Sequence, residues 1–133
     1  VDIGIPVMGH IGFTPQYFKK FRVQGSLEKD RRKLLAQAVN NQKAGVFSIV
    51  LECINSITAK TITKSLKIPT IGIGSSVYCD GQILVTDDML GLSGFYPKFV
   101  KKFANLHNII EIGVKKYKQA VLNKKFPSKK NTY

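Results

Sequence analysis

A chain of 133 residues, 44% of them hydrophobic, is long enough to form one domain with a core of ordinary size, which excludes a disordered tail. No apolar run approaches the roughly 18 residues of a membrane span, and no signal-peptide pattern is present, so we expect a cytoplasmic protein without a membrane partner. The formal net charge is +13, yet only three of the 21 basic residues are arginine, the side chain best suited to phosphate and guanine, which argues against specific nucleic-acid binding.

Four short apolar segments rich in β-branched residues alternate with longer stretches of helical periodicity. We predict strands over residues 5–8, 46–51, 70–73 and 83–85. This alternation is typical of repeated βα units around a parallel sheet. The continuous apolar run of the second segment is typical of a strand in a sheet that is covered on both faces.

Between the first two predicted strands, an amphipathic helix carries its apolar residues on one face. We expect this helix to begin near Ser26, a suitable N-cap residue, and to end at Gly45. A second helix is predicted over residues 56–66, before the proline that opens the third strand. Its expected inner face comprises Ile57, Ala59, Ile62 and Leu66.

The C-terminal region has the apolar spacing of two helices, broken near residues 105–108. Polar residues predominate at the end, so we assign residues 126–133 to a polar tail and residues 1–125 to one domain. Four βα units are half of an eight-stranded barrel, whose usual length is about 250 residues. The chain also begins at Val1 within an apolar stretch, so we expect a further part of the protein upstream.

The C-terminal ends of the predicted strands carry two candidate functional residues, because functional groups collect at these ends in parallel β/α proteins. Glu52 directly follows the second strand. A partly shielded carboxylate there suits general-base work, since desolvation favours its protonated form. His10 follows the first strand in the run Gly-His-Ile-Gly, where its imidazole can donate a hydrogen bond to an anion or carbonyl. A solvated strand-end charge and a loop-fixing histidine are the respective alternatives.

Glycines and cysteines near the strand ends give no further motif by themselves. Gly72 and Gly74 form part of a dinucleotide-binding pattern that lacks its third glycine, so they do not indicate NAD. Cys53 and Cys79 form no CxxC pair and join no histidine cluster, so we expect reduced thiols and neither zinc nor a disulfide. Cys53 ends an apolar run, where a small buried hydrophobe is the commoner role and a nucleophile the alternative.

Five segments, in order along the chain, resemble the ketopantoate hydroxymethyltransferase family. They are PVMGHIGFTPQ at 6–16, VLEC at 50–53, IPTIGIG at 68–74, CDGQILV at 79–85 and DMLGL at 88–92. By this resemblance the chain is the C-terminal half of a family member and supplies roughly the last four βα units of a (β/α)8 TIM barrel. The resemblance further implies a homo-oligomer, commonly a decamer.

The resemblance implies transfer of a hydroxymethyl group from 5,10-methylenetetrahydrofolate to 3-methyl-2-oxobutanoate, giving 2-dehydropantoate for pantothenate synthesis. Mg²⁺ would chelate the keto acid and stabilise its enolate. Glu52 matches the family's proton acceptor, and His10 matches a residue that contacts the bound keto acid. Gly72 and Gly74 would help to shape the folate side of the site.

The family's Mg²⁺ ligands and its substrate-binding lysine belong to the N-terminal half, so no metal ligand is assigned in this chain. Three departures from the family pattern affect the loops around the site. The loop over residues 17–22 is shorter than the family's, Ser75-Ser76 replaces alanine-glycine, and Thr86-Asp87 stands where the family has a histidine before the aspartate. These departures concern the contacts to substrate and folate.

We expect the chain alone to be inactive and to need its N-terminal half for stable folding, because a broken barrel exposes strand edges. Two other interpretations stay open. One is a basic nonenzymatic module that binds nucleic acid or another polyanion. The other is a partner protein whose separately made N-terminal half completes the barrel.

Overall fold

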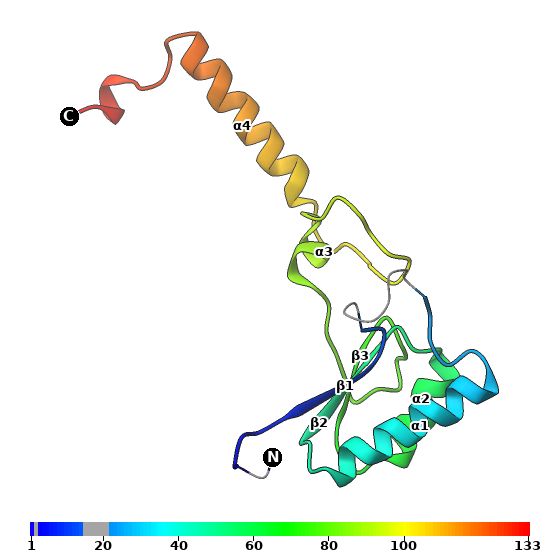
Figure 1. The fold of residues 1–133 in the computed structure, drawn as a ribbon. Helices are drawn as coiled ribbons and strands as arrows, with labels where there is room; N and C mark the ends of the chain where they lie inside the picture. Colours follow the sequence, from blue (N-terminus) through cyan, green and yellow to red (C-terminus); the bar gives the residue numbers. More distant parts are fainter. Residues whose placement is uncertain (2, 15–21) are drawn as a thin grey trace. The chain divides into compact units, whose positions relative to one another are not determined.

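The computed structural model describes residue 1, residues 3–14 and residues 22–133 (Figure 1). The chain divides into two compact units, the N-terminal unit Val1–Ile83 and the C-terminal unit Leu84–Tyr133. Of the shortened loop, only Arg22 lies within the described residues. No helix in these ranges is long and apolar enough to span a membrane.

The N-terminal unit is a parallel sheet of four strands in chain order, with two helices on one face (Figure 1). Its elements are β1 (Met8–Gly12), α1 (Glu28–Lys43), β2 (Ser48–Glu52), α2 (Ser56–Ser65), β3 (Thr70–Ile73) and β4 (Gly81–Gln82). The predicted α/β fold with a parallel sheet is confirmed. In a β/α barrel, too, strands that are consecutive in the chain lie side by side in the sheet, and the helices cover one of its faces.

The core lies between the two helices and the sheet face that they cover. It comprises Ile11, Leu34, Ala38, Ile49, Leu51, Ile54, Ala59, Ile62 and Cys79. Full burial of a side chain as large as Ile49 or Leu51 contributes about 1.5–3 kcal/mol to folding. The predicted inner face of α2 is correct at Ala59 and Ile62 but wrong at Ile57, which is 64% exposed. Ile57 lies two residues before Ala59, about 200° away around the helix, and therefore points to the opposite side.

The ends of α1 agree with the sequence prediction at one end only. Gly45 follows the C-cap with φ +87°, a left-handed conformation that glycine adopts without steric cost, as predicted for the residue that ends this helix. The predicted N-cap at Ser26 is wrong, because Leu27 occupies that position and provides no side-chain hydrogen bond. Glu28 and Asp30 in the first turn interact favourably with the helix dipole instead.

Two of the four strands are displaced from their predicted positions. β1 shares only Met8 with the predicted range 5–8, and β4 precedes the predicted range 83–85 entirely. Three of the apolar side chains that suggested those ranges, Ile5, Ile83 and Val85, are exposed by more than half. β1 contains two glycines, which have low strand propensity, yet pairing with β2 selects this segment. β2 begins two residues later than predicted, and β3 matches its prediction.

The C-terminal unit contains a short helix, a long helix and a final 3-10 turn. These are α3 (Thr86–Leu90), α4 (Leu106–Leu122) and η1 (Lys129–Asn131). The prediction of two helices broken near 105–108 is wrong, since α4 begins at that point and the preceding residues form turns. A backbone hydrogen bond from Phe103 N to Met89 O, 2.8 Å long, holds these turns to α3. The polar segment 126–133 contains η1, which Ser128 caps.

A chain of hydroxyl and carboxylate hydrogen bonds joins α2, β3 and the turn before β4. The Thr70 amide and hydroxyl both donate to Asp80 Oδ2, at 2.8 and 3.0 Å. Because the single Thr70 hydroxyl hydrogen points to Asp80, the hydroxyl of Thr63 on α2 donates to Thr70 Oγ1 at 2.9 Å. The Thr70 amide, followed by its hydroxyl, lowers the pKa of Asp80. Asp80 is therefore a structural acceptor.

Replacing Asp80 by Asn should weaken the protein at neutral pH but not in strong acid. A carboxyl group with a lowered pKa stabilises the fold above its ordinary pKa, and this stability is lost as the pH falls through the lowered value. We expect a loss of up to about 1 kcal/mol at pH 7, because the group is mostly exposed, and a shrinking difference below about pH 3.8. Urea unfolding at pH 7 and at a pH below about 3.8 measures the difference in the free energy of unfolding. Asp88→Asn in the C-terminal unit is the control, and equal losses at both pH values would contradict the prediction.

Candidate active site

The neighbouring strands β1 and β2 bring an imidazole and a carboxylate together. The prediction that both residues follow their strands is wrong, because His10 is the third of the five residues of β1 and Glu52 is the last residue of β2. His10 Nε2 lies 3.0 Å from Glu52 Oε2, and the two side chains are 41% and 20% exposed. In the parallel register Gly12 is opposite Glu52, so His10 and Glu52 meet diagonally across the pair. Both lie on the face of the sheet opposite Ile11 and Leu51, which pack under the helices. The structure thus joins the two residues that the sequence nominated, while their catalytic roles stay predictions.

The turn that follows Glu52 is tied to three other segments by backbone hydrogen bonds. Phe13 N donates to Glu52 O at 2.9 Å, and Cys53 N donates to Ile73 O at 2.9 Å, so the turn is attached to the ends of β1 and β3. Gln24 N donates to Cys53 O at 2.8 Å, and Asn55 N donates to Gln24 O at 2.8 Å. The direction of the Glu52 side chain is therefore set by a backbone held from several sides.

Cys53 is buried and has a φ of +51°, a left-handed conformation that residues other than glycine rarely adopt. Burial, and secondarily the charge of Glu52, raises the pKa of the Cys53 thiol to about 11. The thiol therefore stays protonated near neutral pH, which disfavours the nucleophile alternative. Cys53 and Cys79 are both free and buried.

Gly12 allows β1 and β2 to end as close together as they do. Its φ is +103°, and a Cβ added there would overlap the carbonyl oxygen of Glu52 and approach Ile54 Cγ1 to 2.8 Å. Glycine alone avoids both the strain and the clash. A side chain at this position would separate the strand that carries His10 from the turn that carries Glu52.

The two glycines nominated for the folate side have different surroundings. Gly72 is buried in β3, and a Cβ there would meet Gln82 Oε1 at 2.9 Å and Cys79 Sγ at 3.1 Å, so internal packing already explains this glycine. Gly74 directly follows β3 with φ +60° and turns the chain into the next loop. Their assignment to a cofactor stays a prediction.

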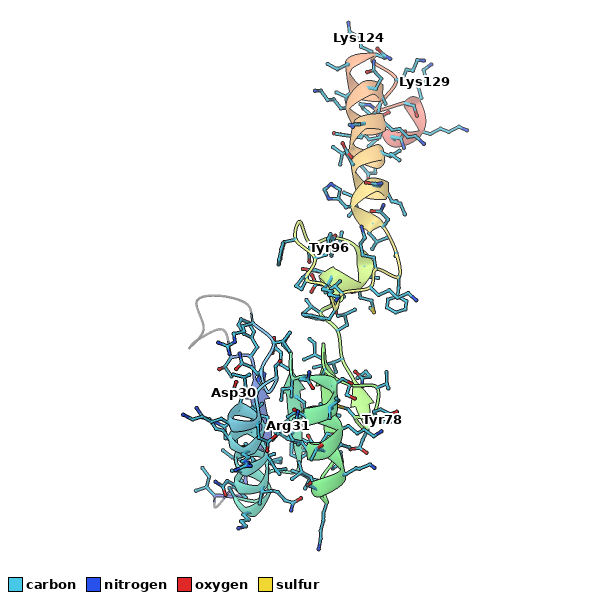
Figure 2. The ribbon with its side chains drawn as sticks, turned by 90° about the vertical axis from the view of Figure 1, so that its right-hand side faces the viewer. Asp30, Arg31, Tyr78, Tyr96, Lys124 and Lys129 are labelled. Carbon is cyan, nitrogen blue, oxygen red and sulfur yellow. The ribbon has the colours of Figure 1, made fainter. Side chains whose placement is uncertain are left out.

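A pocket of about 770 Å³ lies along β1, on the side that carries α1. His10 is among its lining residues but Glu52 is not. Its charged and amide side chains are Arg22, Gln24, Asp30, Lys33 and Gln37. Figure 2 shows Asp30 on α1, where its carboxylate lies 3.8 Å from the Arg22 guanidinium. The sequence alone nominated none of these five side chains as functional.

The described ranges contain no group of three or more His, Cys, Asp or Glu side chains that could hold a metal ion. The carboxylate of Asp80 is engaged by Thr70, as described above. Asp87 and Asp88 lie in the first turn of α3, in the C-terminal unit, whereas the pair of His10 and Glu52 belongs to the N-terminal unit. The described residues of this chain therefore do not form a Mg²⁺ site by themselves.

A parallel sheet whose neighbouring strands bring a carboxylate and an imidazole together is typical of the class of β/α enzymes that work at the C-terminal side of their sheet. Within that class, the model of the ketopantoate hydroxymethyltransferase family matches residues 1–129, so the chain belongs to this family.

Curated relatives are about 50% identical to this chain over the stretch that aligns with it. The chain is 52% identical to the 3-methyl-2-oxobutanoate hydroxymethyltransferase of Bdellovibrio bacteriovorus over 100% of this chain and 52% of the relative. It is 49% identical to that of Pelagibacter ubique over 97% of this chain and 50% of the relative. It is 53% identical to that of a Clostridium botulinum strain over 100% and 50%. The chain thus spans about half the length of the curated relatives that it matches.

Gly12→Ala should destabilise the protein and separate the two candidate catalytic residues. The added methyl group requires movement of the Glu52 backbone as well as strain at positive φ, so we expect a loss of more than about 2 kcal/mol in the free energy of unfolding. Denaturant unfolding measures this loss. Gly94→Ala is the matched control, because a Cβ there has no heavy atom within 4 Å. Equal stability of the two variants would contradict the packing described here.

Cys53 should react slowly with thiol reagents. With a pKa of about 11, roughly one Cys53 in a thousand is a thiolate at pH 8, and burial restricts access further. We expect alkylation by iodoacetamide at pH 8 to be at least about a hundredfold slower than for free cysteine, and to accelerate as the pH rises toward 11. Peptide mass spectrometry measures the rate. Labelling as fast as free cysteine would support the nucleophile alternative.

Proposed function

We propose that this chain is the C-terminal half of a ketopantoate hydroxymethyltransferase, which transfers a one-carbon unit from 5,10-methylenetetrahydrofolate to 3-methyl-2-oxobutanoate and forms 2-dehydropantoate. The observation that carries the proposal is the 3.0 Å contact between His10 and Glu52 on neighbouring parallel strands. Membership of the family supports the reaction, and the half-length match to relatives supports the division into halves.

We propose that an N-terminal half completes a (β/α)8 barrel around this sheet. In a barrel, each strand pairs on both sides and one sheet face lines the interior. Within the described ranges, β1 pairs only with β2, and the pocket lies along β1. The face bearing His10 and Glu52 is not covered by α1 or α2. A chain that lacks the other strands leaves this edge and this face uncovered, which supports the expectation that the chain alone is inactive.

Glu52 is proposed as the base that removes the proton from the carbon beside the keto group. With Glu52 acting as an ionised base, the 3.0 Å contact requires a hydrogen on His10 Nε2, because an unprotonated nitrogen and a carboxylate oxygen would repel each other. This hydrogen bond orients one carboxylate oxygen and leaves the other to take up the proton. The electron pair of the broken C–H bond becomes the enolate, whose carbon forms a bond to the methylene carbon of the folate. Both C–N bonds of that carbon break, and one water supplies the hydroxyl oxygen. The proton taken up by Glu52 and the second hydrogen of the water end on the two nitrogens of the released tetrahydrofolate.

His10 is proposed to bind the keto acid. Its imidazole is 41% exposed, so its Nε2–H can turn from Glu52 to an oxygen of an incoming carboxylate or ketone. That exchange would free Glu52 for proton transfer when substrate is present. Gly72 and Gly74 are assigned to the folate side by family resemblance alone.

The cofactor, oligomer and location are proposals that extend beyond this chain. The described residues do not hold Mg²⁺ by themselves, so we assign its ligands to the N-terminal half and derive no step through the metal. A homo-oligomer, commonly a decamer in the family, is proposed by the same resemblance. Two free cysteines are typical of a reducing compartment and support a cytoplasmic location.

Replacing Glu52 by Gln in the whole protein should abolish formation of 2-dehydropantoate. The amide is close in shape to the carboxylate but cannot accept the proton, so we expect kcat to fall by about 10²–10⁴-fold or more. Product formation is followed by chromatography, and Mg²⁺ binding, measured by calorimetry, should be retained.

Glu111→Gln is the matched control, because it removes the same charge from an exposed position on α4, where Glu111 is paired with Lys115. Its turnover should equal that of the parent protein. Unchanged turnover of the Glu52 variant would remove Glu52 from the mechanism. Absence of turnover in the parent protein, with both halves and Mg²⁺ present, would contradict the proposed function.

A further inference from the structure

The direction of the Glu52 side chain depends on a backbone bend that its own sequence disfavours. The next residue, Cys53, adopts φ +51°, although it has a Cβ that is crowded in this region. Such a conformation persists when the surrounding structure holds it in place. The contacts that hold the bend therefore also hold the carboxylate.

One side chain spans this bend from the loop after β3. The Ser75 hydroxyl donates to Leu51 O at 2.6 Å and accepts a hydrogen bond from Ile54 N at 3.1 Å. These two backbone groups flank Glu52 and Cys53 on either side. Ser75 thus closes a bridge across the two residues whose conformation directs the carboxylate.

Burial makes this bridge difficult to replace with water. Ile54 is 1% exposed and Leu51 is fully buried. A buried amide that loses its acceptor remains unsatisfied unless the backbone moves. The other tethers of the turn run from backbone to backbone, through Phe13, Gln24 and Ile73, so a side-chain substitution does not remove them directly.

The loop that carries Ser75 is itself fixed to the N-terminal unit. The hydroxyl of the next residue, Ser76, accepts the Tyr78 amide at 3.3 Å and bonds to the Ser56 hydroxyl at 3.2 Å. Lys60 Nζ lies 3.7 Å from the centre of the Tyr78 ring, and Figure 2 shows Tyr78 at the edge of this unit. Ser75 is therefore presented to the turn by a loop that α2 anchors.

We infer that Ser75 is a positioning residue for Glu52, acting through the backbone of the turn. This inference rests on the proposed function for its catalytic consequence and deepens the account of the same site. Ser75 touches neither the reacting atoms nor the carboxylate in the contacts described above. Its role is to keep the base aimed at the carbon from which it takes the proton.

Ser75→Ala in the whole protein tests the inference with one kinetic and one structural measurement. A base displaced by less than 1 Å loses rate more than binding, so we expect kcat to fall about tenfold and KM to change less than about twofold. Ser75→Thr, which keeps the hydroxyl, should recover most of the lost kcat. Ser65→Ala removes an exposed hydroxyl that donates to a backbone carbonyl within α2, and it should leave kcat unchanged.

The structural measurement compares alkylation of Cys53 with that of Cys79 in the same sample by peptide mass spectrometry. Loss of the bridge should loosen the turn and raise Cys53 labelling severalfold, roughly threefold or more, while Cys79 stays at the parent rate. Both thiols are buried in the parent protein, so Cys79 reports general unfolding.

Unchanged Cys53 labelling in Ser75→Ala would overturn the inference, as would an equal rise at both cysteines. A selective rise at Cys53 with unchanged kcat in an active parent enzyme would also overturn it, because the turn would then move without displacing the base. If the parent protein has no turnover, the proposed function fails, and the ratio of the two labelling rates still decides whether Ser75 holds the turn.

Discussion

The hydrogen bond from the Phe13 amide to the Glu52 carbonyl joins the ends of β1 and β2, and much of the site depends on that contact. It requires the two backbones to approach within a distance that only glycine at position 12 permits. Because the strands run parallel, the same approach brings the side chains of His10 and Glu52 to one end of one face. The chemistry of the pair is thus a consequence of backbone packing between two short strands.

Parallel pairing also explains how much of the site could be predicted from the sequence. Residues near the C-terminal parts of neighbouring parallel strands come together even when the strand limits are misjudged. Glu52 and His10 could therefore be nominated, although both lie within their strands and not after them as predicted. The limits of the strands were harder to predict, because they depend on which residues of a neighbouring strand are available for pairing. β4 pairs through Gly81 and Gln82, while the more apolar residues beyond them remain exposed. A hydrophobic pattern identifies a segment but not its pairing register.

Contacts made by backbone atoms, or by small side chains acting on backbone atoms, were not detectable in the sequence. Gln24 holds the Glu52 turn through its main chain, which carries no residue-specific signal. Ser75 could be recognised as a departure from the family's alanine, and the structure gives that departure a physical role. The left-handed backbone conformation of Cys53 could not be predicted either, because cysteine rarely adopts it.

The division of the chain after Ile83 bears on how this protein can diverge. Every residue assigned here to proton removal, substrate contact or support of the turn precedes that boundary. Mutations in the C-terminal unit therefore replace none of these groups directly. Ten of the 18 lysines of the chain lie beyond the same boundary, so the basic charge need not record any catalytic demand.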